Sequence, residues 1–87
     1  MLMLHENPVA DRLMELVRPA APGLAQVEGD VTKADLREAG LTSIAAVRLM
    51  LEIEAAFGIA IPDGDLTPEN FANIASIERL VERLQAA

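Results

Sequence analysis

Apolar residues recur at helical spacing in three stretches of the chain, and capping signals mark where each stretch begins. The first predicted helix has Asn7 as its N-cap and Pro8 at its first position. We expect it to end at Pro19, because a proline disfavours helical backbone in the residue before it. Its apolar face comprises Val9, Leu13, Leu16 and Val17.

The second predicted helix, from Ile44 to Phe57, is the most apolar and stops at Gly58, a typical residue after a helix end. Its apolar side chains spread over more than one face, which predicts a central position with several neighbours. Arg48 and Glu52 stand four residues apart on the remaining side, where they are spaced to form a weak ion pair.

Two further capping signals lie in the last third of the chain. Thr67 and Pro68 predict a short third helix, and Asn73 is expected to cap the last one. The apolar stripe of that last helix comprises Ile74, Ile77, Leu80, Val81 and Leu84.

A long segment, residues 19–40, separates the first two helices. A loop of this length in a compact domain is usually functional or contains short turns of its own, and Asp35 and Gly40 are placed to begin and end such a turn. The predicted fold is therefore an all-α four-helix bundle, formed by residues 1–87 as a single domain. It has a long loop between the first two helices and a short third helix.

Composition supports a helical core and narrows the classes of partner. Of the 87 residues, 52% are hydrophobic and only 2% are aromatic, so the core consists of aliphatic side chains, which suits packed helices better than a sheet. The formal net charge of −7 repels phosphate backbones, so we expect no nucleic-acid partner. The chain has no cysteine, no basic region of a signal peptide and no apolar run that would span a membrane. We therefore expect a cytoplasmic monomer with no membrane partner.

Two adjacent hydroxyl residues, Thr42 and Ser43, stand directly before the second helix, although a single hydroxyl is enough to cap it. If Thr42 is the cap, Ser43 occupies the first helical position with its hydroxyl free at the positive end of the helix dipole. A phosphate is stabilised at such a position. If Ser43 is the cap, Thr42 merely precedes it, and the spacing alone favours this second interpretation.

Catalysis by the chain itself is not indicated. A nucleophilic serine needs a neighbouring base, and the only histidine is His5, near the N-terminus. The carboxylates are scattered, and the pair Asp63 and Asp65 lacks the further ligands of a calcium loop. We therefore expect neither an enzyme nor a metal site.

The segment over residues 34–66, ADLREAGLTSIAAVRLMLEIEAAFGIAIPDGDL, resembles the acyl carrier protein family. The resemblance implies the four-helix fold of that family. It also implies a 4′-phosphopantetheine arm on Ser43, which a phosphopantetheinyl transferase attaches from coenzyme A and which carries an acyl or aminoacyl group as a thioester. The family usually has aspartate where this chain has Thr42.

The motif is most similar to small stand-alone aminoacyl carrier proteins, which implies a loading ligase related to aminoacyl-tRNA synthetases and downstream enzymes that use the cargo. A carrier for fatty-acid or polyketide synthesis is one alternative, and an unmodified acidic interaction module is another. Partner encounters should be weak and salt-sensitive. The expected partner contacts are Leu41, Thr42, Ile44, Val47, Arg48 and Glu52.

Overall fold

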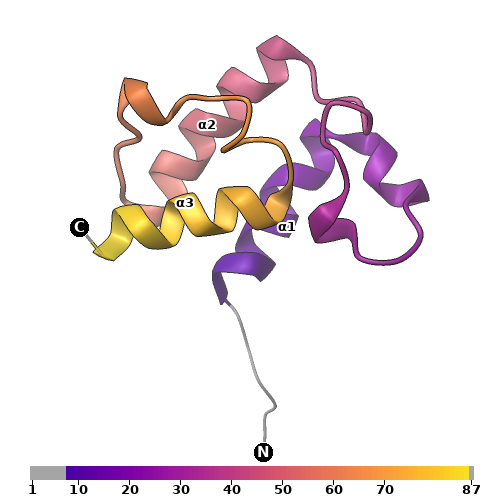
Figure 1. Ribbon diagram of the computed structural model, residues 1–87, viewed down its shortest axis with the longest axis horizontal. Coiled ribbons are helices and arrows are strands. Elements are labelled where there is room, and N and C mark those ends of the chain that lie inside the picture. The colour runs from indigo at the N-terminus through magenta and orange to yellow at the C-terminus, as the bar shows by residue number, and fades with distance from the viewer. Residues whose placement is uncertain (1–7, 87) are drawn as a thin grey trace, which may run out of the picture.

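The computed structural model describes residues 8–86, which form three α-helices and no strand (Figure 1). The helices are α1 (Pro8–Ala20), α2 (Ser43–Phe57) and α3 (Ile74–Ala86). Three 3₁₀ turns lie in the connections: Pro22–Gln26, Val31–Lys33 and Asp63–Asp65. The all-α prediction is confirmed. None of the helices described is long and apolar enough to cross a membrane.

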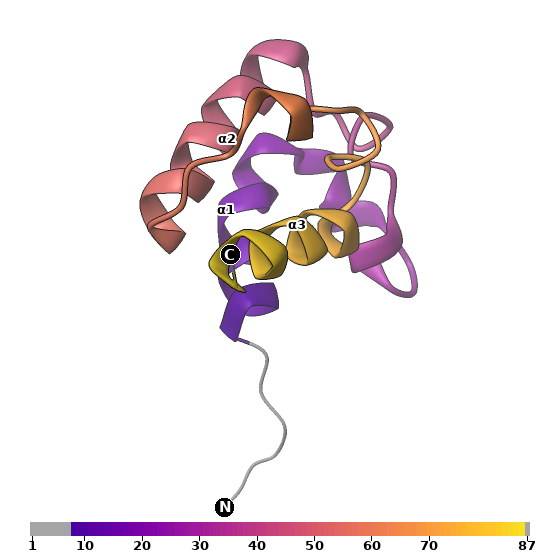
Figure 2. The ribbon, with the colours of Figure 1, turned by 60° about the vertical axis from the view of Figure 1, so that its left-hand side comes forward.

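Helix α1 is the central helix, because it packs against both α2 and α3 and lies between them (Figure 2). The prediction of a central α2 is wrong. Leu49 and Ile53 of α2 are buried, but Ile44, Val47 and Leu51 are exposed. Only one face of α2 packs into the protein, so its apolar character exceeds what the core of this domain uses.

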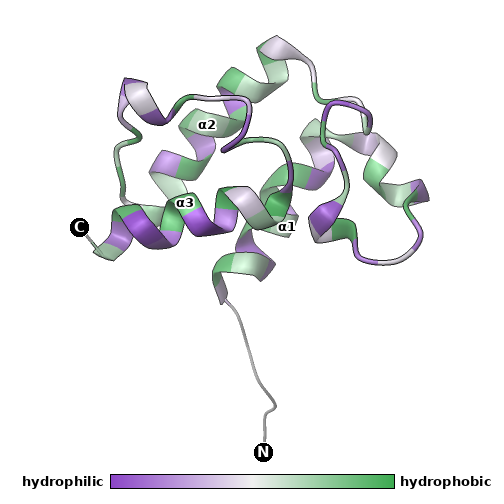
Figure 3. Ribbon diagram, viewed as in Figure 1, coloured by the Kyte–Doolittle hydropathy of each residue, from purple (hydrophilic) through white to green (hydrophobic). Residues whose placement is uncertain are grey.

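The core consists of aliphatic side chains from the three helices and from the connections, such as Leu24, Leu36 and Ile61. Apolar and polar residues alternate along α1 and α3, as the colours of Figure 3 show. The predicted stripes supply the fully buried side chains of these two helices, and Val9, Leu16 and Leu84 lie at the edge of the core. The core residues of α1 and α3 are Leu13, Val17, Ile74, Ile77, Leu80 and Val81.

The predicted ends of α1 need one correction. Helix α1 continues through Pro19 to Ala20, because the amide of Ala21 still donates to the carbonyl of Val17 at 2.9 Å and closes the last turn. The proposed N-cap, Asn7, lies outside the residues that the structure describes.

The connection between α1 and α2 is ordered by a turn of its own, as predicted. Oδ1 of Asp35 accepts hydrogen bonds from the amides of Arg37 and Glu38, and Gly40 ends the turn at φ 103°. The turn is tied to the rest of the protein by the amide of Leu36, which donates to the carbonyl of Ala72 at 2.9 Å. Leu36 itself is fully buried.

The predicted short helix at Thr67 is a turn instead, over residues 68–71. Oγ1 of Thr67 does accept from the amide of Asn70 at 3.2 Å, as a cap would. However, Oδ1 of Asn73 already caps α3 through the amide of Ser76 at 2.7 Å. The stretch between these two caps has room for one turn only, because each α-helical hydrogen bond spans four residues.

The two halves of the long connection meet at Gly23, whose amide donates to the carbonyl of Ala39 at 2.7 Å. A Cβ on Gly23 would lie 2.7 Å from that oxygen and 2.9 Å from the Cα of Ala39. Both obstacles are backbone atoms, so neither can move aside without shifting the turn before α2.

We therefore expect Gly23→Ala to lower the free energy of unfolding by about 1–3 kcal/mol, the usual cost of overpacking. Gly64→Ala is the matched control, because a Cβ there meets nothing within 4 Å and the φ of Gly64 is not positive. Its unfolding free energy should stay within about 0.5 kcal/mol of the parent's. Urea denaturation followed by circular dichroism measures both, and equal midpoints for the two variants would contradict the packing argument.

Candidate functional site

Thr42, not Ser43, is the N-cap of α2. Its backbone is extended, with φ −86° and ψ 168°, and Oγ1 accepts a hydrogen bond from the amide of Ala45 at 3.1 Å. The carbonyl of Thr42 accepts the first intrahelical bond, from the amide of Ala46 at 2.8 Å. The interpretation in which Ser43 caps the helix is therefore wrong. At the other end of α2, Gly58 is in the left-handed conformation, as its predicted role requires.

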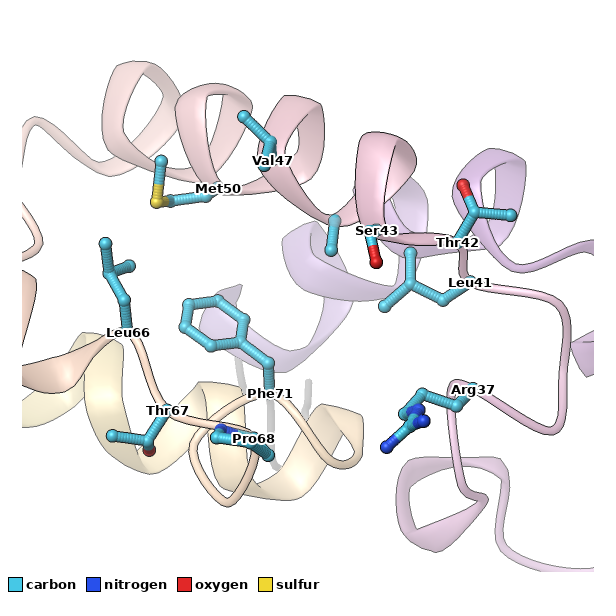
Figure 4. A pocket seen from close by; sticks show the side chains of 11 residues that line it. Arg37, Leu41, Thr42, Ser43, Val47, Met50, Leu66, Thr67, Pro68 and Phe71 are labelled. Atoms are coloured by element: carbon cyan, nitrogen blue, oxygen red, sulfur yellow. The ribbon is translucent and has the colours of Figure 1, made fainter.

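Ser43 is consequently the first residue of α2, and it is exposed. Its hydroxyl forms no hydrogen bond with any residue in the described part of the chain. Figure 4 shows the Ser43 hydroxyl turned toward a groove below α2 and the Thr42 hydroxyl turned away from it. The free hydroxyl thus stands at the positive end of a helix of 15 residues, where negative charge is stabilised.

The groove beside Ser43 has a volume of about 450 Å³ and lies between α2 and residues 66–71 (Figure 4). One end is polar, with Ser43 and Arg37, and the other is apolar, with Met50 and Leu66. The aromatic ring of Phe71 lies between these ends. The full lining is Arg37, Leu41, Thr42, Ser43, Ala46, Val47, Met50, Leu66, Thr67, Pro68 and Phe71.

Hydrogen bonds and an ion pair hold the lower wall of the groove in place. Asp65 pairs with Arg83 of α3 at 3.3 Å, and its carbonyl accepts from Nδ2 of Asn70 at 2.8 Å. Oε2 of Glu54 accepts from the amide of Ile61 at 2.7 Å and so fixes the chain that leaves α2. These contacts place Leu66 opposite α2.

Most of the expected partner contacts lie on the surface of α2 beside Ser43. Ile44 is 80% exposed and Val47 57% exposed, and Thr42, Arg48 and Glu52 are exposed as well. Leu41 differs, because it is buried and its accessible edge lines the groove. The expected Arg48–Glu52 ion pair is not among those formed by the described residues, which are Arg12–Glu15 and Arg83–Asp65.

The sequence prediction missed one exposed residue of this surface, Leu51, which is 56% exposed. Ile44, Val47 and Leu51 stand at positions i, i+3 and i+7 and therefore form one stripe along α2. The same spacing is visible in the sequence, but it indicates an apolar face without showing which face is buried.

Arg48 does not line the Ser43 groove. It lines a second hollow, of about 500 Å³, whose wall includes Leu16 and Pro19 of α1. Glu15 and Glu52 also line this hollow, so the two hollows beside α2 differ in charge.

The different roles of the two hydroxyls predict different effects on stability. Thr42→Ala removes the cap bond to Ala45 and should lower the free energy of unfolding by about 1 kcal/mol. Ser43→Ala removes a hydroxyl that bonds to nothing described, and the expected change is below about 0.5 kcal/mol. Chemical denaturation of both variants tests the assignment, and a larger loss for Ser43→Ala would reverse it.

Comparison with known proteins gives a consistent result. The family described as "Phosphopantetheine attachment site" matches residues 12–84. The chain is 38% identical over 80 residues to aminoacyl carrier protein 1 of Bradyrhizobium diazoefficiens. The aligned region covers 92% of this chain and 89% of the relative. It is also 52% identical over 50 residues to the aminoacyl carrier protein of Agrobacterium fabrum. Here the aligned region covers 58% of this chain and 60% of that relative.

Two solved structures have a similar fold. One is the crystal structure of Bradyrhizobium japonicum glycine:[carrier protein] ligase complexed with its cognate carrier protein and an analogue of glycyl adenylate. A chain of that structure matches with a TM-score of 0.73 and 33% identity, over 88% of this chain and 99% of that one. The complex of the same ligase with glycylated carrier protein matches with a TM-score of 0.69 and 35% identity, over 85% and 99%. The match to the family spans the cap, the free serine and the groove, and this chain therefore belongs to the carrier proteins that bear a phosphopantetheine attachment site.

Proposed function

We propose that this chain is an aminoacyl carrier protein with its 4′-phosphopantetheine arm attached to Ser43. The observation that carries the proposal is the free, exposed hydroxyl of Ser43 at the first position of α2, which exists because Thr42 supplies the cap. The bound group supplies a terminal thiol on which cargo is held as a thioester.

The residues around Ser43 fit such a group. No carboxylate of the described part of the chain lines the groove, so an attached phosphodiester meets no like charge from these residues. Beyond the Ser43 end, the wall offers Val47, Phe71 and Met50, which suit the aliphatic part of the arm.

Attachment requires a partner enzyme. Ser43 Oγ forms a bond to the phosphorus of coenzyme A that carries the pantetheine, the phosphoanhydride bond breaks, and adenosine 3′,5′-bisphosphate leaves. None of the described residues that line the groove is a histidine or a carboxylate, so we expect the phosphopantetheinyl transferase to supply the base that accepts the Ser43 proton. We propose accordingly that the chain is not itself an enzyme.

The relatives favour an amino acid as cargo. Two of them are named aminoacyl carrier proteins, and the similar structures contain a glycine:[carrier protein] ligase. We propose that an amino acid:carrier protein ligase loads this chain and that glycine is the first cargo to test. The chain spans 89% of the first relative, which supports one carrier domain, and we propose that it acts as a monomer.

Modification is tested by incubating the protein with coenzyme A and a broad-specificity phosphopantetheinyl transferase. Intact mass spectrometry should show one phosphopantetheine adduct on the parent and on Thr42→Ala, and none on Ser43→Ala. An unmodified parent would favour the acidic interaction module instead, and an adduct that persists in Ser43→Ala would place the attachment elsewhere.

Cargo is a separate question that the modified protein answers. The holo form is offered glycine and other amino acids with ATP and a glycine:[carrier protein] ligase, and, in a parallel assay, fatty acyl groups with an acyl-ACP synthetase. Loading of fatty acyl groups alone would make the fatty-acid or polyketide alternative the better one.

We propose that the loading ligase binds the exposed stripe formed by Ile44, Val47 and Leu51. It begins next to Ser43, so an enzyme that reaches the arm comes close to it. Exposed apolar side chains that form a contiguous patch usually mark an interaction site. Arg48 and Glu52 flank the stripe and provide a charged border of both signs.

Leu51→Ser should therefore lower kcat/KM for loading by about three- to tenfold, the effect of an interface side chain that contributes about 1 kcal/mol. The free energy of unfolding should change little, since Leu51 is more than half exposed. Gln85→Ser, on the exposed end of α3, is the control and should load at the parent rate. Equal loading by the two variants would remove the stripe from the interface.

A further inference from the structure

Among the residues that the structure describes, Arg37 is the only ionisable side chain that lines the groove beside Ser43. The whole chain has fourteen acidic and seven basic residues, yet none of the acids within residues 8–86 contributes to this lining. A single positive charge therefore stands at the Ser43 end of the groove in an otherwise acidic protein.

The backbone of Arg37 is held in a defined place. Its amide donates to Oδ1 of Asp35 at 2.9 Å, and its carbonyl accepts from the amide of Gly40 at 3.1 Å. The next turn of the chain is fixed as well, because the amide of Leu41 donates to the carbonyl of Leu36 at 2.9 Å. The position from which the Arg37 side chain extends is thus set by the same turn that leads into α2.

The guanidinium of Arg37, in contrast, is not engaged. It forms no ion pair or side-chain hydrogen bond within residues 8–86, where the ion pairs are Arg12–Glu15 and Arg83–Asp65. Figure 4 shows it at the same end of the groove as Ser43 and Leu41, on the opposite wall from Ser43. Because the backbone of Arg37 is fixed and its guanidinium has no partner within residues 8–86, the side chain is suited to bind an anion.

We propose that Arg37 is a positioning residue for the phosphodiester of the arm. This inference rests on the proposed attachment at Ser43. Guanidinium groups bind phosphate oxygens through paired N–H donors, and the positive end of α2 acts on the same anion. Held between these two, the phosphodiester directs the arm along the groove toward Phe71 and Met50 rather than into solvent.

The experiment uses the holo forms of the parent, Arg37→Gln, Arg37→Lys and the control Arg18→Gln. Modification is driven to completion and verified by intact mass, so the rate of the transferase does not enter. NMR then reports the ³¹P shift of the phosphodiester and the NOEs between the geminal methyl groups of the arm and the Phe71 ring. Spectra of the apo forms verify that each variant keeps the parent fold.

Arg37→Gln should lower the ratio of docked to free arm by about two- to fivefold, the range for one exposed charge pair. The NOEs weaken and the ³¹P signal moves toward that of free pantetheine phosphodiester. Arg37→Lys should retain part of the effect, because it keeps the charge but loses the paired donors. Arg18→Gln should match the parent, because Arg18 is exposed at the end of α1 and lines neither hollow. Added NaCl should lower the docked fraction of the arm more in the parent than in Arg37→Gln, where only the positive end of α2 still attracts the phosphodiester.

Two results would overturn the inference, and they differ in what else they remove. If Arg37→Gln carries the adduct and its ³¹P shift, NOEs and salt response equal those of the parent, Arg37 has no positioning role and the carrier function stands. If the parent acquires no adduct on Ser43, both the attachment and the role of Arg37 are wrong.

Discussion

The hydrogen bond from the amide of Ala45 to Oγ1 of Thr42 determines how this site is built. A helix of 15 residues begins there with amides that need acceptors, and one side chain must supply the first. Because Thr42 does so, Ser43 is inside the helix with its hydroxyl unbonded, exposed and next to the positive end of the dipole. An aspartate could cap the helix equally well but would place a carboxylate beside an incoming phosphate. Threonine supplies the cap without a negative charge, and Arg37 on the opposite wall adds a positive charge, which favours a phosphate.

The groove depends on contacts made far from Ser43. Its upper wall belongs to α2, whereas its lower wall is a stretch of chain without a helix of its own. That lower wall is held by the pairing of Asp65 with Arg83 and by the bonds of Asn70 to Asp65 and Thr67. The turn that carries Arg37 is joined to the same region through the amide of Leu36 and the carbonyl of Ala72. Three separate segments thus meet in one hollow, and contacts between residues far apart in the sequence, Asp65 with Arg83 and Leu36 with Ala72, hold them together.

Local signals predicted the parts of the structure that local interactions decide. The cap at Asn73, the stop at Gly58 and the turn begun by Asp35 all involve bonds within a few residues, and all appear as the sequence indicates. The short helix at Thr67 does not form, because the next cap comes too soon for a second turn. The choice between Thr42 and Ser43 as cap could not be made from the sequence, since either hydroxyl satisfies the same pattern. Arg37 went unnoticed because only the folded chain brings it opposite Ser43.

The apolar composition of α2 predicted a central position for this helix, and the size of the domain explains why that prediction was wrong. A domain of 87 residues has a limited interior, and α1 takes its centre, so α2 can bury only one face. Leu49 and Ile53 use that face, and the apolar residues on the other side remain in water. An exposed apolar stripe promotes self-association of a protein that has no partner bound. The net charge of −7 opposes this association. The acidic surface and the exposed apolar stripe beside Ser43 are therefore consistent with a protein that binds partners briefly. A partner would cover the stripe during each encounter, and the net charge would limit self-association between encounters.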